Sequence, residues 1–158
     1  MSYDNLLRTH QGAVRSFLRR LCKSYALADD LAQECFIKAY NNFDQLNTEA
    51  AAQFWLFGIA YRCFLDHNRK ETRRRHLIDM VPETNQTVTM PSSRLDLEAA
   101  MGTLSSDCRA CVILCLAYGY THEDTAALTN LALGTVKSHI QRGKKRLKTF
   151  LQDYERVG

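Results

Sequence analysis

Apolar residues recur along most of the chain at intervals of three and four, the spacing that places them on one face of an α-helix. The first stripe consists of Leu7, Val14, Phe17, Leu18 and Leu21, and the second of Leu27, Leu31, Cys35, Phe36, Ala39, Tyr40 and Phe43. A third helix is predicted from about Gln53 through FWLFGIAYRCFLDHNRK. Since no useful stretch alternates as a strand would, the pattern predicts an all-α fold.

The helical stripes stop between residues 77 and 96. Both prolines, Pro82 and Pro91, fall in this segment, which is also rich in Thr, Ser and Asn. Proline removes backbone donors and these polar residues compete for the backbone, so a flexible linker is predicted. Helices resume at about 95–104, 107–118 and 121–129, followed by a last one from about Gly134. The sequence therefore predicts two small helical bundles, 1–76 and 97–158, joined by the linker.

Positive charge is concentrated in two segments. Residues 62–76 hold six Arg or Lys against two acids, and residues 137–148 hold six against none, whereas the whole chain of 158 residues carries only +4. Like charges on one short helix repel one another, so two such segments in one chain indicate an extended polyanion as partner. The alternative is a pair of ordinary solvated helix faces, which explains most single charge runs.

The second basic segment follows the signals of a helix-turn-helix. In Thr121-His-Glu-Asp124 the threonine hydroxyl can cap a short helix whose first turn is acidic. Asn130 then tolerates the left-handed conformation of a tight turn, and Leu131 and Leu133 are placed to fill the corner. A helix, a short turn and a basic helix form the arrangement that places its second helix in the DNA major groove. A basic helix packed on its own domain is the structural alternative.

The two halves together resemble a known family. DDLAQECFIKAY and WLFGIA resemble region 2 of bacterial RNA polymerase sigma factors, and GTVKSHIQR resembles region 4. The order of these segments and the linker between them resemble the extracytoplasmic-function (ECF) group of the sigma-70 family, over about residues 7–151. The resemblance implies core RNA polymerase and promoter DNA as partners, with an anti-sigma protein as a further possible partner.

The resemblance also implies roles for individual residues. Docking on core polymerase is expected from Asp29, Asp30, Gln33 and Glu34. Contacts with the melted −10 element, where the family holds a flipped base, are expected from Asn47, Arg62, Asp66, Asn68, Arg69, Arg73 and Arg74. Readout of the duplex −35 element is expected from Lys137, Ser138, His139, Gln141, Arg142 and Lys145.

Three positions depart from the family pattern. Arg62 stands where an asparagine is usual, which favours a phosphate contact over a base contact there. Asn130 stands where the turn commonly has glycine. Gly143 replaces a usual alanine in the recognition helix, at a cost of about 1 kcal/mol in helix propensity.

Three other classes of function have weaker support in the sequence. Cys108, Cys111 and Cys115 share one helical face, which would suit a metal or redox sensor with His122, although a core stripe is the commoner reason for such spacing. No nucleophile signature or phosphate loop indicates an enzyme, and neither a catalytic residue, a cofactor nor a metal site is expected. A stand-alone helix-turn-helix regulator, with 1–76 as a dimerisation or sensing bundle, remains the alternative.

The expected location is the cytoplasm. No apolar run approaches the roughly 20 residues that span a bilayer, and the segment MSYDNLLRTHQ lacks the pattern of a signal peptide. The six cysteines are therefore expected to be free thiols.

Overall fold

The computed structural model of the chain describes residues 1–77 and 93–157. Its elements in chain order are α1 (Tyr3–Leu21), α2 (Tyr25–Asn41), the 3-10 turns η1 (Phe43–Gln45) and η2 (Glu49–Ala51), α3 (Ala52–Leu77), α4 (Ser93–Gly102), α5 (Ser106–Val112), the π-helical turn η3 (Ile113–Ala117), α6 (His122–Thr129) and α7 (Leu133–Val157). Every regular element in the described ranges is helical, which confirms the predicted all-α class. None of the described helices combines the length and apolar character that crossing a membrane requires.

The first bundle consists of α1, α2 and α3, which pack against one another pairwise. Serine hydroxyls cap the first two helices, because Ser2 accepts from the amide of Asn5 and Ser24 from that of Leu27, both at 3.3 Å. The predicted stripes form the core, with two corrections. Leu6 is fully buried where Leu7 was expected, and Tyr40 is 65% exposed although it was assigned to the core.

The second bundle consists of α4, α5, α6 and α7, and the first three of these helices each pack against α7. The N-terminus of α5 is capped by Ser105, whose hydroxyl accepts from the amide of Cys108. The helix continues into η3, so the predicted helix 107–118 begins one residue earlier and changes to π geometry near its end. The predicted linker falls largely on residues 78–92, outside those described, while α3 extends to Leu77 and α4 begins at Ser93.

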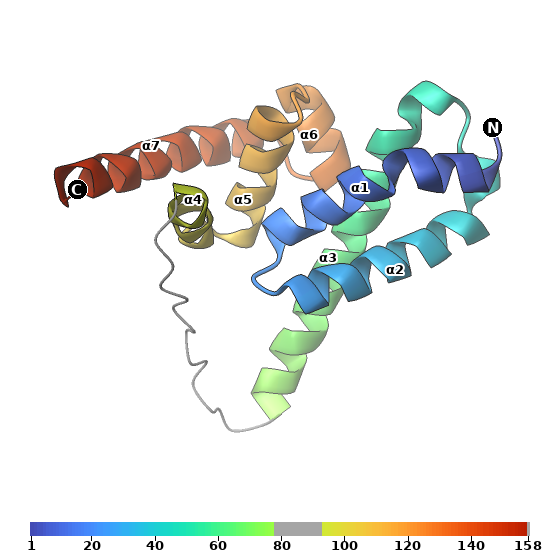
Figure 1. The fold of residues 1–158 in the computed structure, drawn as a ribbon, viewed down its shortest axis with the longest axis horizontal. Coiled ribbons are helices and arrows are strands. Elements are labelled where there is room, and N and C mark those ends of the chain that lie inside the picture. Colours follow the sequence, from blue (N-terminus) through green and yellow to red (C-terminus); the bar gives the residue numbers. More distant parts are fainter. Residues whose placement is uncertain (78–92, 158) are drawn as a thin grey trace.

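The two bundles pack against each other (Figure 1). The contact joins α6 to α3 and α5 to the end of α1. One apolar cluster includes residues of both bundles, because Ala110, Ile113, Leu114 and Leu128 are buried together with the core of α1, α2 and α3. The sequence predicted two bundles and gave no sign of this shared core.

Candidate nucleic-acid interface

The helix-turn-helix has the predicted local geometry. The hydroxyl of Thr121 accepts from the amide of Asp124 at 3.0 Å and caps α6, where Glu123 and Asp124 lie in the first turn. Asn130 adopts the left-handed conformation, with φ 59° and ψ 29°, which turns the chain from α6 into α7. The predicted corner residues differ from each other: Leu131 is half-buried, whereas Leu133 is 37% exposed and begins α7.

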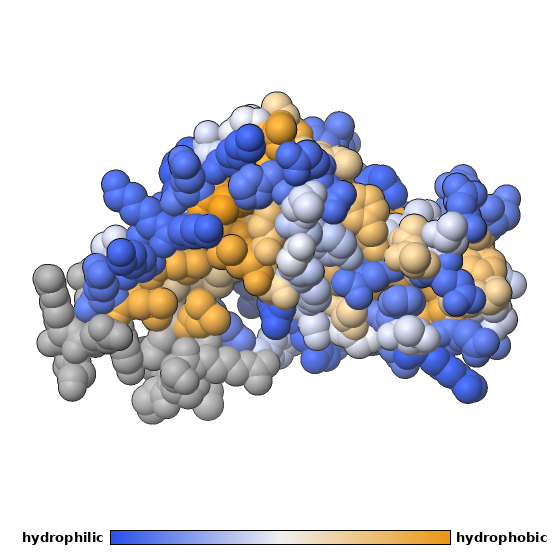
Figure 2. All heavy atoms as spheres, turned by 90° about the horizontal axis from the view of Figure 1, so that it is seen from above, coloured by the Kyte–Doolittle hydropathy of each residue, from blue (hydrophilic) through white to orange (hydrophobic). Residues whose placement is uncertain are grey.

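One face of α7 is buried and the opposite face is polar. Val136, Ile140 and Gly143 are buried, and Leu147 is half-buried. At 100° per residue, Ser138, Gln141, Arg142 and Lys145 project within about 50° of the direction opposite to this stripe. All four are exposed, so the structure brings these predicted −35 residues together on one outward face. Hydrophilic atoms gather over the part of the molecule where α7 lies (Figure 2).

The two remaining predicted residues of this helix flank the outward face. Lys137 is exposed and lies about 90° from its centre, and His139 lies about 110° away on the other side. His139 is half-buried, and its carbonyl accepts from the thiol of Cys108 in α5 at 3.1 Å. His139 is therefore the member of the predicted set that is least able to reach a base edge.

The other predicted DNA contacts follow α3. Arg62, Asp66, Arg69, Arg73 and Arg74 are exposed, and Asn68 is half-buried. Two of the arginines lie near an acid one turn away: Arg69 is 3.7 Å from Asp66, and Arg74 is 3.8 Å from Glu71. Exposed pairs of this kind contribute little to stability, so these guanidinium groups can exchange the acid for a phosphate.

Asn47 lies apart from these arginines. It is exposed in the loop between η1 and η2, just before the N-terminus of α3 (Figure 1). Arg73 lies 21 residues beyond the start of α3, and a rise of 1.5 Å per residue separates the two ends by about 30 Å. The predicted −10 residues therefore form a strip along α3, with Asn47 at one end, and not one compact pocket.

The predicted polymerase-docking residues lie on α2. Asp30 and Gln33 are exposed, whereas Asp29 pairs with Arg15 at 3.6 Å and Arg19 at 3.2 Å, and Glu34 pairs with Lys38 at 2.9 Å. Two large apolar side chains, Ile37 (63% exposed) and Tyr40 (65% exposed), share the face of Asp30 and Gln33.

This mixed surface on α2 is typical of a protein-binding face, because exposed apolar groups are ringed by polar ones. Sequence reasoning missed Ile37 and assigned Tyr40 to the core. The signal that could have identified them is their spacing. Ile37 lies two turns beyond Asp30, and Tyr40 lies two turns beyond Gln33. Both therefore lie outside the stripe of Leu31, Cys35 and Ala39.

The three cysteines of the second bundle face neighbouring helices. Cys108 and Cys111 are buried against α7, where Cys111 packs with Val136 and Ile140. Cys115 is half-buried, with its sulfur 3.1 Å from the hydroxyl of Thr125. Burial raises the pKa of Cys111 to about 12, which keeps this thiol protonated and unreactive. In the part of the chain that the structure describes, no cluster of His, Cys, Asp and Glu is placed to hold a metal.

Comparisons with known proteins identify both halves. Residues 6–74 match the family model for Sigma-70 region 2, and residues 94–147 match that for Sigma-70, region 4. The ECF RNA polymerase sigma factor SigE of Mycolicibacterium smegmatis is 34% identical over 159 residues; the match covers 95% of this chain but only 62% of that protein's length. The ECF RNA polymerase sigma factor EcfG of Rhodopseudomonas palustris is 33% identical over 145 residues, covering 88% of this chain and 79% of that protein.

A solved structure shares the arrangement of both halves. The sigma factor RpoE of Bartonella quintana, in complex with the anti-sigma factor NepR, matches with a TM-score of 0.80 and 29% identity, over 95% of this chain and 96% of that one. CnrH, in complex with the cytosolic domain of CnrY, shares the fold at a TM-score of 0.66 and 20% identity, over 96% and 88%. With both sigma-70 regions matched in order, the chain belongs to the ECF group of sigma-70-family RNA polymerase sigma factors.

Proposed function

We propose that this chain directs core RNA polymerase to specific promoters, reading the −35 element with α7 and the melted −10 element with α3. The observation that carries the proposal is that one chain holds two separate basic surfaces, each on a different half. A duplex-reading helix requires exposed polar side chains around a rigid turn, and a strand-tracking surface requires a row of cations. The outward face of α7 and the arginine strip of α3 meet these two requirements.

Within the −35 surface, different residues take different roles. Ser138, Gln141 and Arg142 lie in the first half of α7, where a recognition helix contacts base edges. Lys145 lies one turn further on and is suited to a phosphate. Because His139 is half-buried and lies about 110° from the centre of the outward face, we assign it no base contact.

Within the −10 surface, Arg62 and the arginines 69, 73 and 74 would follow the phosphates of the freed strand. Asn47 and Asn68 carry amides that can bind base edges. The length of about 30 Å from the start of α3 to Arg73 would suit an extended single strand better than one flipped base. Arg69 would exchange its 3.7 Å pair with Asp66 for a phosphate of this strand.

Core polymerase would dock on the α2 face, where Asp30 and Gln33 supply polar contacts and Ile37 and Tyr40 supply apolar area. We assign no catalytic step to the chain itself, because phosphodiester synthesis would belong to the polymerase. Promoter DNA and polymerase meet in the bacterial cytoplasm, so the chain would act there. Since the Bartonella quintana relative is bound by an anti-sigma factor, a protein that covers the α2 face is also proposed as a regulator.

The experiment is run-off transcription with bacterial core polymerase on genomic fragments that include the region upstream of the chain's own gene. Discrete transcripts that require the chain support the proposal, and their start sites give both promoter elements. Gln141→Ala should reduce transcription by impairing −35 recognition, whereas Thr149→Ala, on the same helix, serves as the matched control. If no transcripts form and the chain alone binds symmetric duplex sites as a dimer, it is a stand-alone helix-turn-helix regulator and the proposal fails.

A further inference from the structure

A salt bridge on α2 lies between the face proposed to dock core polymerase and the arginine strip of α3. Lys38 and Glu34 pair at 2.9 Å, one turn apart. The docking face of α2 is centred between Gln33 and Ile37. At 100° per residue, Glu34 lies about 80° from that centre and Lys38 lies about 120° from it, in the same direction. Glu34 therefore stands at the edge of the docking face, and Lys38 stands beyond it.

Lys38 reaches the boundary between α2 and α3. The hydrogen bond to Glu34 raises the pKa of Lys38 against the effect of partial burial, and the Cys63 thiol and Asp66 carboxylate of α3 raise it further. Burial raises the pKa of Cys63, and the positive charge of Lys38 opposes that rise. The ammonium group of Lys38 therefore lies beside α3, although the Lys38 side chain is still 44% exposed.

The part of α3 that lies beside Lys38 belongs to the proposed −10 surface. Arg62, Asp66 and Arg69 follow one another at intervals of four and three, which places them on one side of the helix. Asp66 pairs with Arg69 at 3.7 Å. Charges of alternating sign thus cross from Glu34 and Lys38 on α2 to this pair on α3. A phosphate that reached this side of α3 would meet Lys38 as well as the arginines.

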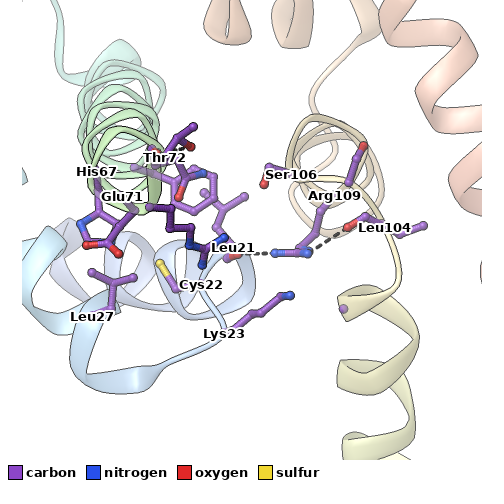
Figure 3. A pocket seen from close by; sticks show the side chains of 15 residues that line it. Leu21, Cys22, Lys23, Leu27, His67, Glu71, Thr72, Leu104, Ser106 and Arg109 are labelled. Carbon is purple, nitrogen blue, oxygen red and sulfur yellow. Dashed lines mark hydrogen bonds between the residues drawn. The ribbon is translucent and has the colours of Figure 1, made fainter. Parts of the chain in front are cut away.

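The opposite side of α3 faces the second bundle. Glu71 lies nearly opposite the strip around the helix, and with His67 it lines a cleft of about 660 Å³ between the bundles (Figure 3). At this cleft Arg109 of α5 donates to the carbonyl oxygen of Leu21 at 2.6 Å. The strip is therefore turned away from the second bundle, and Lys38 of α2 is a neighbouring cation on its own side.

Glu34 competes with DNA for Lys38. An exposed pair of residues one turn apart contributes little to stability, so a phosphate can replace the carboxylate as the partner of the ammonium group. The carboxylate of Glu34 is 45% exposed, and it can exchange Lys38 for a cation of a docked protein in the same way. Either exchange frees the other member of the pair.

We propose that Lys38 contacts a phosphate of the melted −10 strand, and that Glu34 withholds it until core polymerase engages Glu34. This inference rests on the proposed promoter-reading function and on the docking role expected for Glu34. A polymerase cation that pairs with Glu34 leaves Lys38 free for DNA. Because coupling between two binding sites is reciprocal, a strand bound to Lys38 leaves Glu34 free for polymerase.

The test measures binding of a fluorescein-labelled single strand that carries the −10 sequence found by run-off mapping. In the free chain, Glu34→Gln should raise the affinity for this strand about twofold, because Lys38 is no longer withheld. Glu123→Gln, on α6 of the second bundle, is the matched control for the loss of one negative charge. In the Lys38→Met background, which keeps the apolar stem, the gain from Glu34→Gln should fall to that of the control.

The second readout is the salt dependence of strand binding by the holoenzyme at saturating core polymerase. Lys38→Met should reduce the slope of log affinity against log salt by about 0.7, the value for one phosphate on a single strand. Lys38→Arg keeps the charge and should restore the wild-type slope. Lys23→Met, a loss of one positive charge at the cleft side of the first bundle, should leave the slope unchanged. Glu34→Gln should no longer raise the affinity, since polymerase already engages Glu34.

Three results would overturn the inference. A gain from Glu34→Gln that persists in Lys38→Met would mean general charge repulsion, and an unchanged salt slope in Lys38→Met would exclude the phosphate contact. A gain from Glu34→Gln that is equally large in the holoenzyme would exclude release by polymerase. Arg69→Ala separates the two proposals: if it weakens strand binding and Lys38→Met does not, only this inference fails, whereas no effect of either variant refutes the proposed −10 surface.

Discussion

Gly143 is buried where α7 crosses α5, and its replacement by alanine sets two effects against each other. Alanine would improve helix propensity by about 1 kcal/mol. However, a Cβ at this position would lie 2.4 Å from the Cγ2 of Val112 and 3.3 Å from the sulfur of Cys108. Val112 is 3% exposed, and a valine in a helix strongly prefers one rotamer, so its methyl group cannot move aside easily.

The overlap with Val112 should decide whether Gly143→Ala raises or lowers the free energy of unfolding. Overpacking of a filled core costs about 1–3 kcal/mol, so Gly143→Ala should lower the free energy of unfolding by about 1 kcal/mol after the helix gain is subtracted. The measurement is equilibrium unfolding in urea, followed by circular dichroism. Gly12→Ala in α1 is the matched control, because a Cβ there meets nothing within 4 Å and should stabilise the chain by up to about 1 kcal/mol.

A double-mutant cycle isolates the overlap itself. Val112→Ala removes the methyl group that the new Cβ would strike, and it costs stability on its own by leaving a cavity. In that background Gly143→Ala should become stabilising, so its effect changes sign. If Gly143→Ala stabilises the wild type as much as Gly12→Ala does, α7 does not require glycine at this crossing and the reasoning is refuted.

Three further predictions concern the cap, the thiols and the DNA surface. Thr121→Ala removes the bond to the amide of Asp124 and should cost about 1 kcal/mol in urea unfolding; an unchanged midpoint would contradict the cap. Burial raises the pKa of Cys35 and of Cys111 from 9.0 to about 12, so the folded state holds protons that the unfolded state loses above pH 9. The stabilisation from these two protonated thiols is complete below pH 9 and is lost as the pH rises towards 12. The melting temperature should therefore fall between pH 9 and 10.5, and it should fall less steeply in Cys35→Ala. Lys145→Ala should reduce by about one the number of counterions released on binding of the −35 duplex, without altering sequence preference. Competition between duplexes of different sequence at several salt concentrations measures both quantities.

The sequence predicted those features that depend on neighbouring residues. Thr121 caps α6 and Asn130 turns the chain because a hydroxyl before an acidic turn, and an amide in the left-handed region, act within a few residues. The buried stripe of α7 was likewise predicted, since Val136 and Ile140 follow helical spacing. Which side chains of the outward face meet DNA stays a prediction from resemblance and exposure.

Features that depend on distant residues could not be predicted. Gly143 was interpreted as a loss of helix propensity, whereas the structure shows that Val112 requires it, and nothing in the local sequence states which helix lies opposite. Tyr40 was placed in the core because it falls beside the apolar stripe, yet it is 65% exposed. Arg109 lies in a helix of small residues, and none of the residues three or four positions away is an acid that could pair with it and indicate its burial.

These distant contacts converge on α5, which is packed on two sides. Towards α7 it presents Cys108 and Val112, and towards α1 it presents Arg109. The helix proposed to read the −35 element and the contact between the two halves through Arg109 therefore share one seven-residue support. A displacement of α5 by Gly143→Ala should strain the bond from Arg109 to Leu21.

Gly143→Ala and Arg109→Lys should consequently be non-additive in unfolding free energy, by about 0.5 kcal/mol or more, because neighbouring sites that share a displaced element couple. Gly12→Ala with Arg109→Lys should be additive within about 0.3–0.5 kcal/mol, since Gly12 lies on open surface. If both pairs are additive, the alanine at position 143 is accommodated without a displacement of α5 that reaches Arg109. The helix proposed to read the −35 element and the contact from Arg109 to Leu21 would then be energetically independent.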